Sequence, residues 1–596
     1  MSARPRLELA VGVTGHREAN LAGIDRVGLR SAVDAALAQI EAALQVVARQ
    51  HAEVFDAAPP RLRLVSALAD GADSLVAHAA LDAGWRLDAC LPFARDEYAA
   101  DFGVVQLADF EALLTRASAV FELPARRDDA EAAYEAAGRL ILDQSDLLVA
   151  LWDGHPNRGR GGTSRVVAEA VARQVPVLHI HAGGAEPPQL LWSGLGVAEM
   201  EQPTVDTVPR AAVAEMLPKV VAALTEPPQQ EVDRRMLRGY LVERTTRSRP
   251  PITYPLLLAA AGVRRLSRRD LRPLAAGDGA KALRAPLAGE RLDPRFLDRI
   301  AQRYGIADLA GTFFAQVFRS GFIANYLLAG LAVVLALSGL IAPAFKLPLI
   351  LAELACVGLI LVNTQAGRRL GWHERWMDNR HLAEQLRSLA LSSTVGDLAL
   401  RSTTGTRDAA ATPGWVDWMA RATARETGLP HARADEGYLG AVRDAALHML
   451  DEQLGYHRAN AARMHKLDHR LSLAGEVLFG ATVLACLAWI TFKIGGLPMG
   501  PKGKVGLTEI VTFATAALPA LASAIYGIRQ QGDFGGAAFR SQVTVERLER
   551  LRHYMSGDPI EHARLSARLR SLSDIMTNDI SNWRSTVKAR PLTLPG

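Results

Sequence analysis

The first third of the chain alternates short apolar runs with longer amphipathic segments. Strand-like runs cover residues 7–13, 61–68, 86–92, 119–124, 145–154 and 175–181. Helical patterns lie between them, with one helix before residue 145 and others over residues 23–50, 71–84, 96–117 and 161–174. Strands that alternate with helices predict an α/β fold with a doubly wound parallel sheet of Rossmann-like type over residues 1–182.

The second half carries four long apolar runs in two close pairs, over residues 321–345, 347–362, 471–492 and 505–528. Their lengths approach or exceed the roughly 17–25 helical residues that cross a hydrocarbon core. The first run has no charged residue, and each of the others has one acid: Glu353, Glu476 or Glu509. A buried soluble helix explains any single run. Four paired runs predict an all-α membrane domain with four transmembrane helices.

Basic residues predict how these runs are oriented. Those near the outer connections are Lys346, Lys493, Lys502 and Lys504. A larger group flanks the opposite ends, namely Arg319, Arg368, Arg369, Arg375, Arg458, Arg463, Lys466, Arg470, Arg529 and Arg540. Because cytoplasmic flanks carry the excess of Lys and Arg, both termini and the segment 364–470 are expected in the cytoplasm. The N-terminus has no signal-like apolar stretch, so we expect a multi-pass protein of the inner (cytoplasmic) membrane.

The second pair of runs repeats the first. Trp372, Trp376, Asn379, Ala383 and Leu386 follow run two in steps of 4, 3, 4 and 3, and an offset of 162 residues lays them on Phe534, Ala538, Ser541, Val545 and Leu548. The same offset lays run two on run four and Glu384 on Glu546. A shared offset predicts two copies of one unit, each a membrane hairpin followed by a packing helix. The expected units are residues 301–400 and residues 401–596, the latter including a cytosolic helical insert.

Residues 183–300 are interrupted by proline-rich stretches and by the basic run 264–272. We interpret them as a linker with solvated helices, with contact to the membrane surface as the alternative. The net charge of +5 is explained by the basic flanks, so no nucleic-acid partner is expected. The three cysteines have no metal or disulfide spacing, and neither a metal nor a firmly assigned cofactor is predicted.

Three glycine-bearing loops follow predicted strands. The first contains Gly12, Thr14, Gly15, His16 and Arg17, in which small residues admit a phosphate and Arg17 supplies charge. The second contains Ser66, Asp70, Gly71 and Asp73 before a helix whose N-terminus favours an anion. The third contains Asp153, Gly161, Gly162 and Thr163. Glycines that shape turns and aspartates that cap helices explain each loop separately. Three such loops at strand ends of one sheet together predict a ligand site. His16 receives no catalytic role.

The motifs VGVTGHRE, SALADGADSLVAHAALDAG and SDLLVALWDG…GGT resemble the SLOG superfamily over about residues 5–182. This Rossmann-like group includes DNA-processing proteins, LOG phosphoribohydrolases and the sensor regions of melastatin-type TRP channels. The membrane half resembles the SLATT family, two-span effectors associated with SLOG sensors in bacterial conflict systems, here present twice. The resemblance implies a sensor of a nucleotide or nucleotide-derived second messenger, coupled to a pore-forming or membrane-perturbing effector in antiviral defence.

One departure bears on catalysis. LOG enzymes carry a catalytic glutamate three residues after the threonine of their glycine-rich motif, whereas Thr163 is followed by Val166 at that position and the first glutamate is Glu169. Ligand binding without turnover is therefore expected. A membrane-tethered nucleotide N-glycosidase or phosphoribohydrolase is the alternative, and a transporter needs more spans.

Glu353 lies inside an apolar run, where ionisable groups usually face a bundle interior or a wet cavity. It is the candidate pore residue, with a protonated, hydrogen-bonded Glu353 as the equally weighted alternative. Apolar residues on helices below the membrane need partners, either within the chain or across subunits, and a homo-oligomer embedded in the lipid bilayer is expected.

Overall fold

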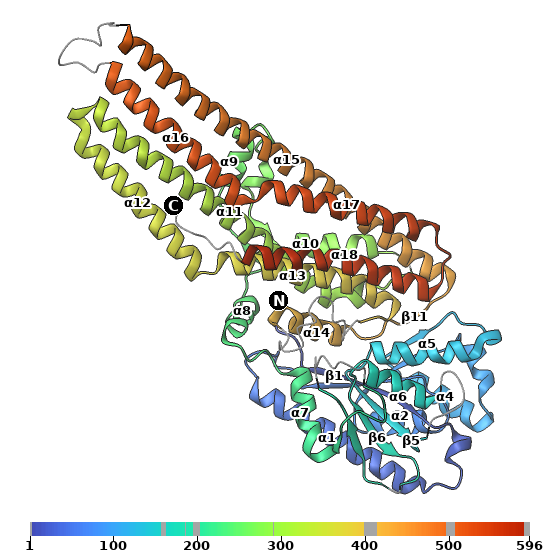
Figure 1. The fold of residues 1–596 in the computed structure, drawn as a ribbon. Coiled ribbons are helices and arrows are strands. Elements are labelled where there is room, and N and C mark those ends of the chain that lie inside the picture. The colour runs from blue at the N-terminus through green and yellow to red at the C-terminus, as the bar shows by residue number, and fades with distance from the viewer. Residues whose placement is uncertain are drawn as a thin grey trace.

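A computed structural model shows a sheet-containing part at one end and a long helical part at the other (Figure 1). The structure describes residues 3–155, 162–184, 186–194, 203–289, 291–398, 414–495 and 507–588. Within these ranges there are two sheets, one of nine strands and one of two. The larger sheet carries the candidate site.

The large sheet has the order β11-β4-β3-β2-β1-β5-β6-β7-β8. The six strands that come first along the chain are parallel to one another. They are β1 (Glu8–Gly15), β2 (Arg61–Ser66), β3 (Arg86–Leu91), β4 (Ala119–Glu122), β5 (Leu147–Trp152) and β6 (Val177–His181). Strands β1, β2, β3 and β5 are almost wholly buried, which is why their sequences read as largely apolar runs. The predicted α/β sheet is confirmed.

Helices connect these strands in two groups. Along the chain, α1 (Arg26–Gln50), α2 (Ala72–Asp82) and α4 (Val104–Arg116) precede β2, β3 and β4, and α2 contacts both of the other two. The helices α5 (Ala130–Asp143) and α6 (Thr163–Ala172) flank β5 and contact each other. The strand order reverses between β1 and β5, which is where ligands of such sheets bind.

Two expectations for this region are corrected. The helix expected over 96–117 is broken into α3 (Arg95–Tyr98), a 3-10 turn and α4, because Gly103 takes the N-cap position of a new helix. The sheet also continues past residue 182. Strand β7 (Gln189–Leu191) pairs antiparallel with β6, strand β8 (Arg210–Ala212) pairs antiparallel with β7, and α7 (Val213–Thr225) packs on α1.

The segment expected as a linker is structured as well. It contains α8 (Glu231–Leu241), α9 (Thr253–Ala260), α10 (Ala276–Arg284) and a small antiparallel sheet of β9 (Thr246–Arg247) and β10 (Leu274–Ala275). Helix α10 packs on the long helix that follows, and the α9 backbone amide of Tyr254 donates to the Ser320 hydroxyl at 3.2 Å. Short apolar anchors thus hold the segment against the helical part.

The expected cytosolic insert partly returns to the sheet. Helix α14 (Trp415–Thr427) contacts β1, and β11 (Ala432–Arg433) pairs in parallel with β4 at the sheet edge. The Arg425 guanidinium of α14 binds both carboxylate oxygens of Asp146, at 2.9–3.0 Å, beside β5. The segment that follows the first repeat is therefore part of the α/β fold.

The helical part contains two sets of three consecutive helices. The first set is α11 (Asp298–Ile341), α12 (Lys346–Arg369) and α13 (Trp372–Ser392), and the second is α15 (Glu436–Ile494), α16 (Leu507–Gly532) and α17 (Phe534–Gly557). A final helix, α18 (His562–Lys588), packs on α13 and α17. An offset of 162 residues lays α12 on α16 and α13 on α17 within a few residues at each end.

The junction below each hairpin also repeats. Gly371 and Asp533, which are 162 residues apart, both adopt the left-handed conformation, with φ of 60° and 45°. The seam residues that follow are mostly buried, although Val545 and Trp372 are only partly so. One matched pair differs: Glu384 is fully buried between Arg380 and Arg387, whereas Glu546 is exposed.

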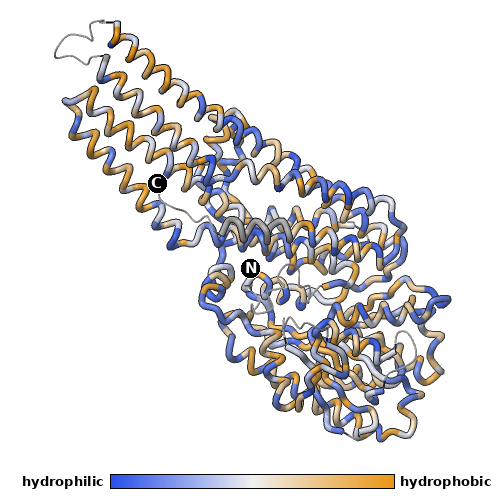
Figure 2. Tube along the Cα trace, in the orientation of Figure 1, coloured by the Kyte–Doolittle hydropathy of each residue, from blue (hydrophilic) through white to orange (hydrophobic). Residues whose placement is uncertain are grey.

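Among the residues that the structure describes, five helical segments are long and apolar enough to cross a membrane by length and composition, namely Arg26–Gln50, Arg295–Ile341, Pro343–Arg369, Glu436–Ile494 and Thr508–Gly557. The first is α1, which buries Leu29, Val33, Leu37 and Leu44 in the core beside the sheet. The other four contain the runs expected to span a membrane. Figure 2 shows their apolar residues concentrated in the ends that project away from the sheet.

Candidate ligand site

The three predicted loops lie at one edge of the sheet. β1 pairs with β2 on one side and with β5 on the other, so the carboxyl ends of all three strands are neighbours. Gly15 is paired with Leu151, and the His16 backbone amide donates to the Leu151 carbonyl at 3.0 Å. The structure therefore brings the first loop beside both of the others at the position where the strand order reverses.

Glycines let the first two loops touch. Gly71 has φ of +92°, and a Cβ there would lie 2.5 Å from the Glu18 amide nitrogen. A Cβ on Gly15 would overlap that of Ala72. The Ala72 amide donates to the His16 carbonyl at 3.0 Å. This α2 amide, which we expected to face an anion, is already bonded to the first loop.

Gly12 has a different role from the rest of its loop. It lies inside β1, paired with Val65 and Leu148, three residues before the strand ends. A Cβ there would lie 2.6 Å from Ser145 Oγ. Close packing against the start of β5 therefore explains this glycine, and it does not line the strand end.

The second loop places a buried carboxyl group under the site. Asp73 is 6 % exposed, and the Ser66 hydroxyl lies 3.4 Å from its Oδ2 as a donor. Burial raises the pKa of Asp73 to about 7, against the opposing effect of the Ala69 backbone, Arg17 and Ser66. Asp73 is thus poised between its neutral and ionised forms near neutral pH.

The third loop is tied to the first by two hydrogen bonds. The Asp153 amide donates to His16 Nε2 at 3.2 Å, and the Thr163 hydroxyl donates to the Gly15 carbonyl at 2.8 Å. Partial burial raises the pKa of Asp153, but the His155 amide and the His16 ring outweigh it and leave this pKa lowered. Gly162 is the N-cap of α6, and Gly161 lies outside the described residues.

Arg17 lies at the centre of a charged cluster. Its guanidinium nitrogens are 3.8 Å from Asp70 Oδ1 and 3.8 Å from Asp101 Oδ2, and its Cζ is 5.0 Å from the centroid of the Tyr134 ring. Burial lowers the pKa of Arg17, but Tyr134, Tyr98 and Asp70 more than offset it, so this pKa is raised. Arg17 is therefore a fixed positive charge in an acidic environment.

Four members of this cluster were not foreseen from the sequence: Tyr98, Asp101, Arg127 and Tyr134. Arg127 pairs with Asp101 at 2.5 Å, and the Tyr134 hydroxyl donates to the same carboxylate. Tyr98 and Asp101 follow the end of β3, so their place after a third parallel strand was the signal available. Arg127 and Tyr134 come from the turn before α5 and from α5 itself, which no strand-end pattern marks.

Two polar atoms of the cluster are buried without a hydrogen-bond partner among the described residues, Asp70 Oδ1 and the Tyr98 hydroxyl. Buried polar groups of this kind are normally satisfied, by protein, water or ligand. Three carboxyl groups, Asp70, Asp73 and Asp101, lie near Arg17 and accept hydrogen bonds when ionised. This part of the site suits hydroxyl or amino groups of a ligand better than a phosphate.

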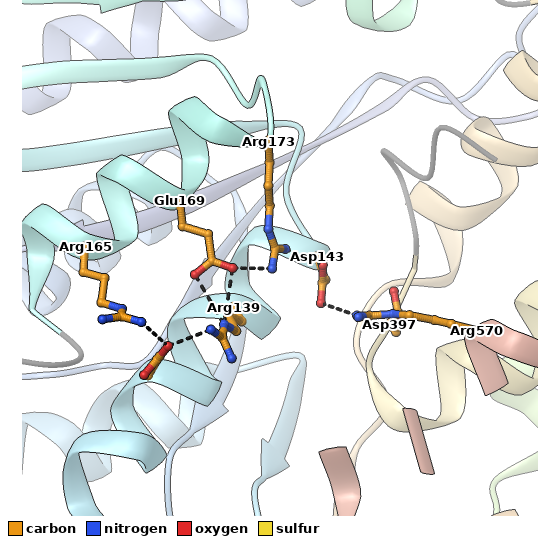
Figure 3. A network of polar contacts seen from close by, with 8 residues as sticks. Arg139, Asp143, Arg165, Glu169, Arg173, Asp397 and Arg570 are labelled. Atoms are coloured by element: carbon orange, nitrogen blue, oxygen red, sulfur yellow. Dashed lines mark hydrogen bonds and ion pairs between the residues drawn. The ribbon is translucent and has the colours of Figure 1, made fainter. Parts of the chain in front are cut away.

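The remaining candidate residues lie elsewhere. Glu169, on α6, is paired with Arg139 at 3.3 Å and with Arg173 (Figure 3). Glu353, on α12, is partly exposed, and no hydrogen bond or ion pair of its side chain is found within the part of the chain that the structure describes. The same residues contain no group of three or more His, Cys, Asp or Glu arranged to hold a metal ion.

Comparison with known proteins adds no relative. No protein-family model matches the sequence, and no curated protein matches it. The sheet and its strand-end cluster define the first part of the chain as a Rossmann-like α/β domain, and the second part is a duplicated set of long helices.

Proposed function

We propose that this protein is a membrane effector that senses a nucleotide-derived ligand, with four helices in the bilayer and the α/β domain in the cytoplasm. The observation that carries the membrane assignment is the exposure of α12. Six of its large apolar residues are more than half exposed: Leu347, Leu351, Leu354, Leu359, Leu361 and Val362. Leaving one such side chain in water forgoes about 1.5–3 kcal/mol, so a lipid environment is strongly favoured.

Polar residues at one end of the helices support a position for the membrane boundary. Asn325, Asn363 and Thr364 form a buried hydrogen-bonded group between α11 and α12, with distances of 2.7 and 2.9 Å. Asp468 and Arg529 pair at 2.8 and 3.0 Å between α15 and α16. Beyond these groups the helices are mostly apolar, which supports a cytoplasmic boundary close to Gly371 and Asp533. Both chain termini then lie on the cytoplasmic side.

Labelling of introduced cysteines tests this topology, in a background without the exposed Cys486. An impermeant maleimide applied to intact cells should modify cysteines at positions 498–503 and spare those at 400–410. Permeabilised cells provide the control, because all positions should then react. Labelling of positions 400–410 in intact cells would refute the orientation.

The ligand assignment rests on the strand-end cluster, which lies at the usual binding position of such sheets. We propose that Asp70, Asp101 and Tyr98 bind the sugar hydroxyl or amino groups of a nucleotide derivative, beside Arg17. The phosphates of this nucleotide derivative would face the N-terminus of α6, where the third glycine-bearing loop ends. From the resemblance to SLOG sensors and SLATT effectors we also propose a role in bacterial defence.

Binding of labelled adenine and guanine nucleotides by purified protein tests the site. Arg17→Glu and Asp101→Asn should each weaken binding at least tenfold, whereas Arg95→Ala, in an exposed pair with Glu111, should leave it unchanged. Recovery of intact nucleotide supports a sensor. Release of base or ribose phosphate would instead establish the alternative, a membrane-tethered N-glycosidase or phosphoribohydrolase.

The effector step is proposed to be ion conduction by an oligomer, with Glu353 beside the path. Ion flux through liposomes that contain the protein should rise when the bound nucleotide class is added, and Glu353→Gln should change its ion selectivity. Unchanged selectivity would remove Glu353 from the lining. A monomer without ligand-dependent flux would refute the channel.

A further inference from the structure

The four apolar helices form one layer, in the order α12, α11, α16, α15 (Figure 1). Helix α11 contacts both α12 and α16, and α15 contacts α16. The contact between the two repeats is therefore α11 against α16. Helices α12 and α15 form the two edges of the layer. The most apolar stretch of α15 is 0 % buried by the rest of the protein.

Small residues make the contact between repeats close. A Cβ on Gly330 of α11 would lie 3.3 Å from side-chain atoms of Ala524 and Leu521 on α16. One turn away the partners are reversed, and the ring of Tyr326 lies over Gly527. Close approach at small residues is the usual basis of helix packing in membranes.

The chain repeats both halves of this contact on its open edges. The offset of 162 lays Leu521, Ala524 and Gly527 of α16 on Leu359, Val362 and Gln365 of α12. An offset of 150 lays α11 on α15 with six identities, at positions 305, 324, 328, 330, 333 and 337 of the first helix. Gly330 thus corresponds to Gly480, and Tyr326 to Glu476.

The corresponding positions are unoccupied by protein. Leu359 and Val362 are 56 % and 68 % exposed. A Cβ on Gly480 would have no atom within 4 Å, in contrast to its equivalent Gly330. The same two surfaces that meet within the chain are therefore both presented, unpaired, at opposite edges of the layer.

We infer that α15 of one copy packs against α12 of a second copy and reproduces the α11–α16 contact, an inference that rests on the proposed membrane location. Gly480 then faces Leu359 and Val362, and Glu476 lies beside Gln365, which can donate a hydrogen bond to it. The two edges are unlike, so the contact is head-to-tail, and such contacts close into rings when the rotation permits. A ring of copies is a continuous wall of alternating repeats.

Disulfide cross-linking in native membranes tests the contact, in a background of Cys356→Ala and Cys486→Ala. The double variant Gly480→Cys, Val362→Cys should give a ladder of dimers and larger species on oxidation, because every copy carries both edges. The matched control is Gly480→Cys, Leu361→Cys. Leu361 is also exposed, at 52 %, but points about 100° away around the helix, so its yield should be several-fold lower.

Single variants establish the direction of the contact. Copies with Gly480→Cys mixed with copies with Val362→Cys should give dimers only, and each variant alone should give almost none. Strong cross-linking of Gly480→Cys alone would indicate a two-fold contact and overturn the proposal, as would equal yields for the double variant and its control.

A bulky residue should separate assembly from folding. Gly480→Leu should remove the ladder and reduce native mass to that of the monomer while thermal unfolding of the subunit is unchanged. Gly330→Leu, inside the chain, should destabilise the subunit itself. A variant that combines Gly480→Leu with the cysteine pair Glu476→Cys and Gln365→Cys should therefore give no ladder. A full ladder from this variant would contradict the contact. A ladder without ion flux supports the contact and removes only the pore, whereas flux without any ladder overturns the contact.

Discussion

At the scale of single residues, the α/β domain is held by charges that have no access to water. Arg425 and Asp146 are 4 % and 2 % exposed and form a two-pronged ion pair between α14 and the turn before β5. Asp146 also accepts from the Ala10 amide of β1 at 3.2 Å, and Arg425 donates to the Leu224 carbonyl at 2.8 Å. One pair thus joins parts of the chain that are 279 residues apart.

Arg425→Ala should lower the free energy of unfolding by about 3–5 kcal/mol, because it leaves the buried Asp146 carboxylate without its cation. Denaturant titration of the detergent-solubilised protein measures this, with Trp415 and Trp418 of α14 as fluorescent reporters. The control is Arg458→Ala, whose partner Glu549 is exposed, with an expected loss below about 1 kcal/mol. Equal losses in the two variants would contradict the assigned role of the pair.

Asp73 should make stability fall as pH rises. Its pKa is about 7 in the folded protein and near 3.8 when unfolded, so between these values the folded state holds the proton more tightly. Stability is full below pH 4, declines toward pH 7 and stays reduced above it. Asp73→Asn removes this decline and should gain roughly 1–4 kcal/mol over the native chain at pH 8, since one pKa unit is about 1.4 kcal/mol. A constant difference between the two proteins from pH 5 to pH 8 would refute the assignment.

At the scale of elements, hydrophobic periodicity predicted β1 to β6 and most of their helices because each is buried over its whole length or along one face. It missed β7, β8 and β11, which have two or three residues each and are defined by the strand they pair with. The three strand-end loops were predicted because parallel topology gathers them. The cluster of Tyr98, Asp101, Arg127 and Tyr134 was missed because tertiary packing assembles it.

The junction between each apolar helical hairpin and its packing helix requires a left-handed residue. Gly371→Val should cost about 1–2 kcal/mol or more of stability, because a branched side chain clashes with the backbone at positive φ. Gly371→Asn should cost much less, since asparagine tolerates this conformation and the matched position is already Asp533. Thermal unfolding of both variants measures the difference. Similar losses would show that space, and not φ, limits position 371.

At the scale of the whole molecule, the sheet and the helical part are joined by more than the chain. Arg570 of α18 pairs with Asp397 at 2.5 Å and with Asp143, at the end of α5, at 3.0 Å (Figure 3). Burial, followed by the nearby Asp397, raises the pKa of Asp143 to about 6. The Arg570 contact is one direct connection between the sheet and the helices, and the segment of α14 and β11 is the second. A structural change at the sheet can therefore reach the helices by two routes.

The boundary of the α/β domain is the last prediction. A fragment of residues 1–182 retains six parallel strands but lacks α7, the two outer strands and Arg425, so Asp146 loses the Arg425 cation and β6 loses the strand that pairs with it. It should aggregate or unfold at low temperature.

A fragment of residues 1–226 restores α7, β7 and β8, and joining residues 414–434 to it through a flexible linker also restores α14 and β11. Only the last fragment contains Arg425, the cation that pairs with Asp146. It should therefore show the highest midpoint of thermal unfolding by circular dichroism. The same joined fragment with Arg425→Ala is the control, and it should lose most of the gain. If residues 1–182 alone unfold at the same temperature as the joined fragment, the α/β domain is independent of the second half, and a connection from the strand-end cluster to the long helices through α14 is excluded.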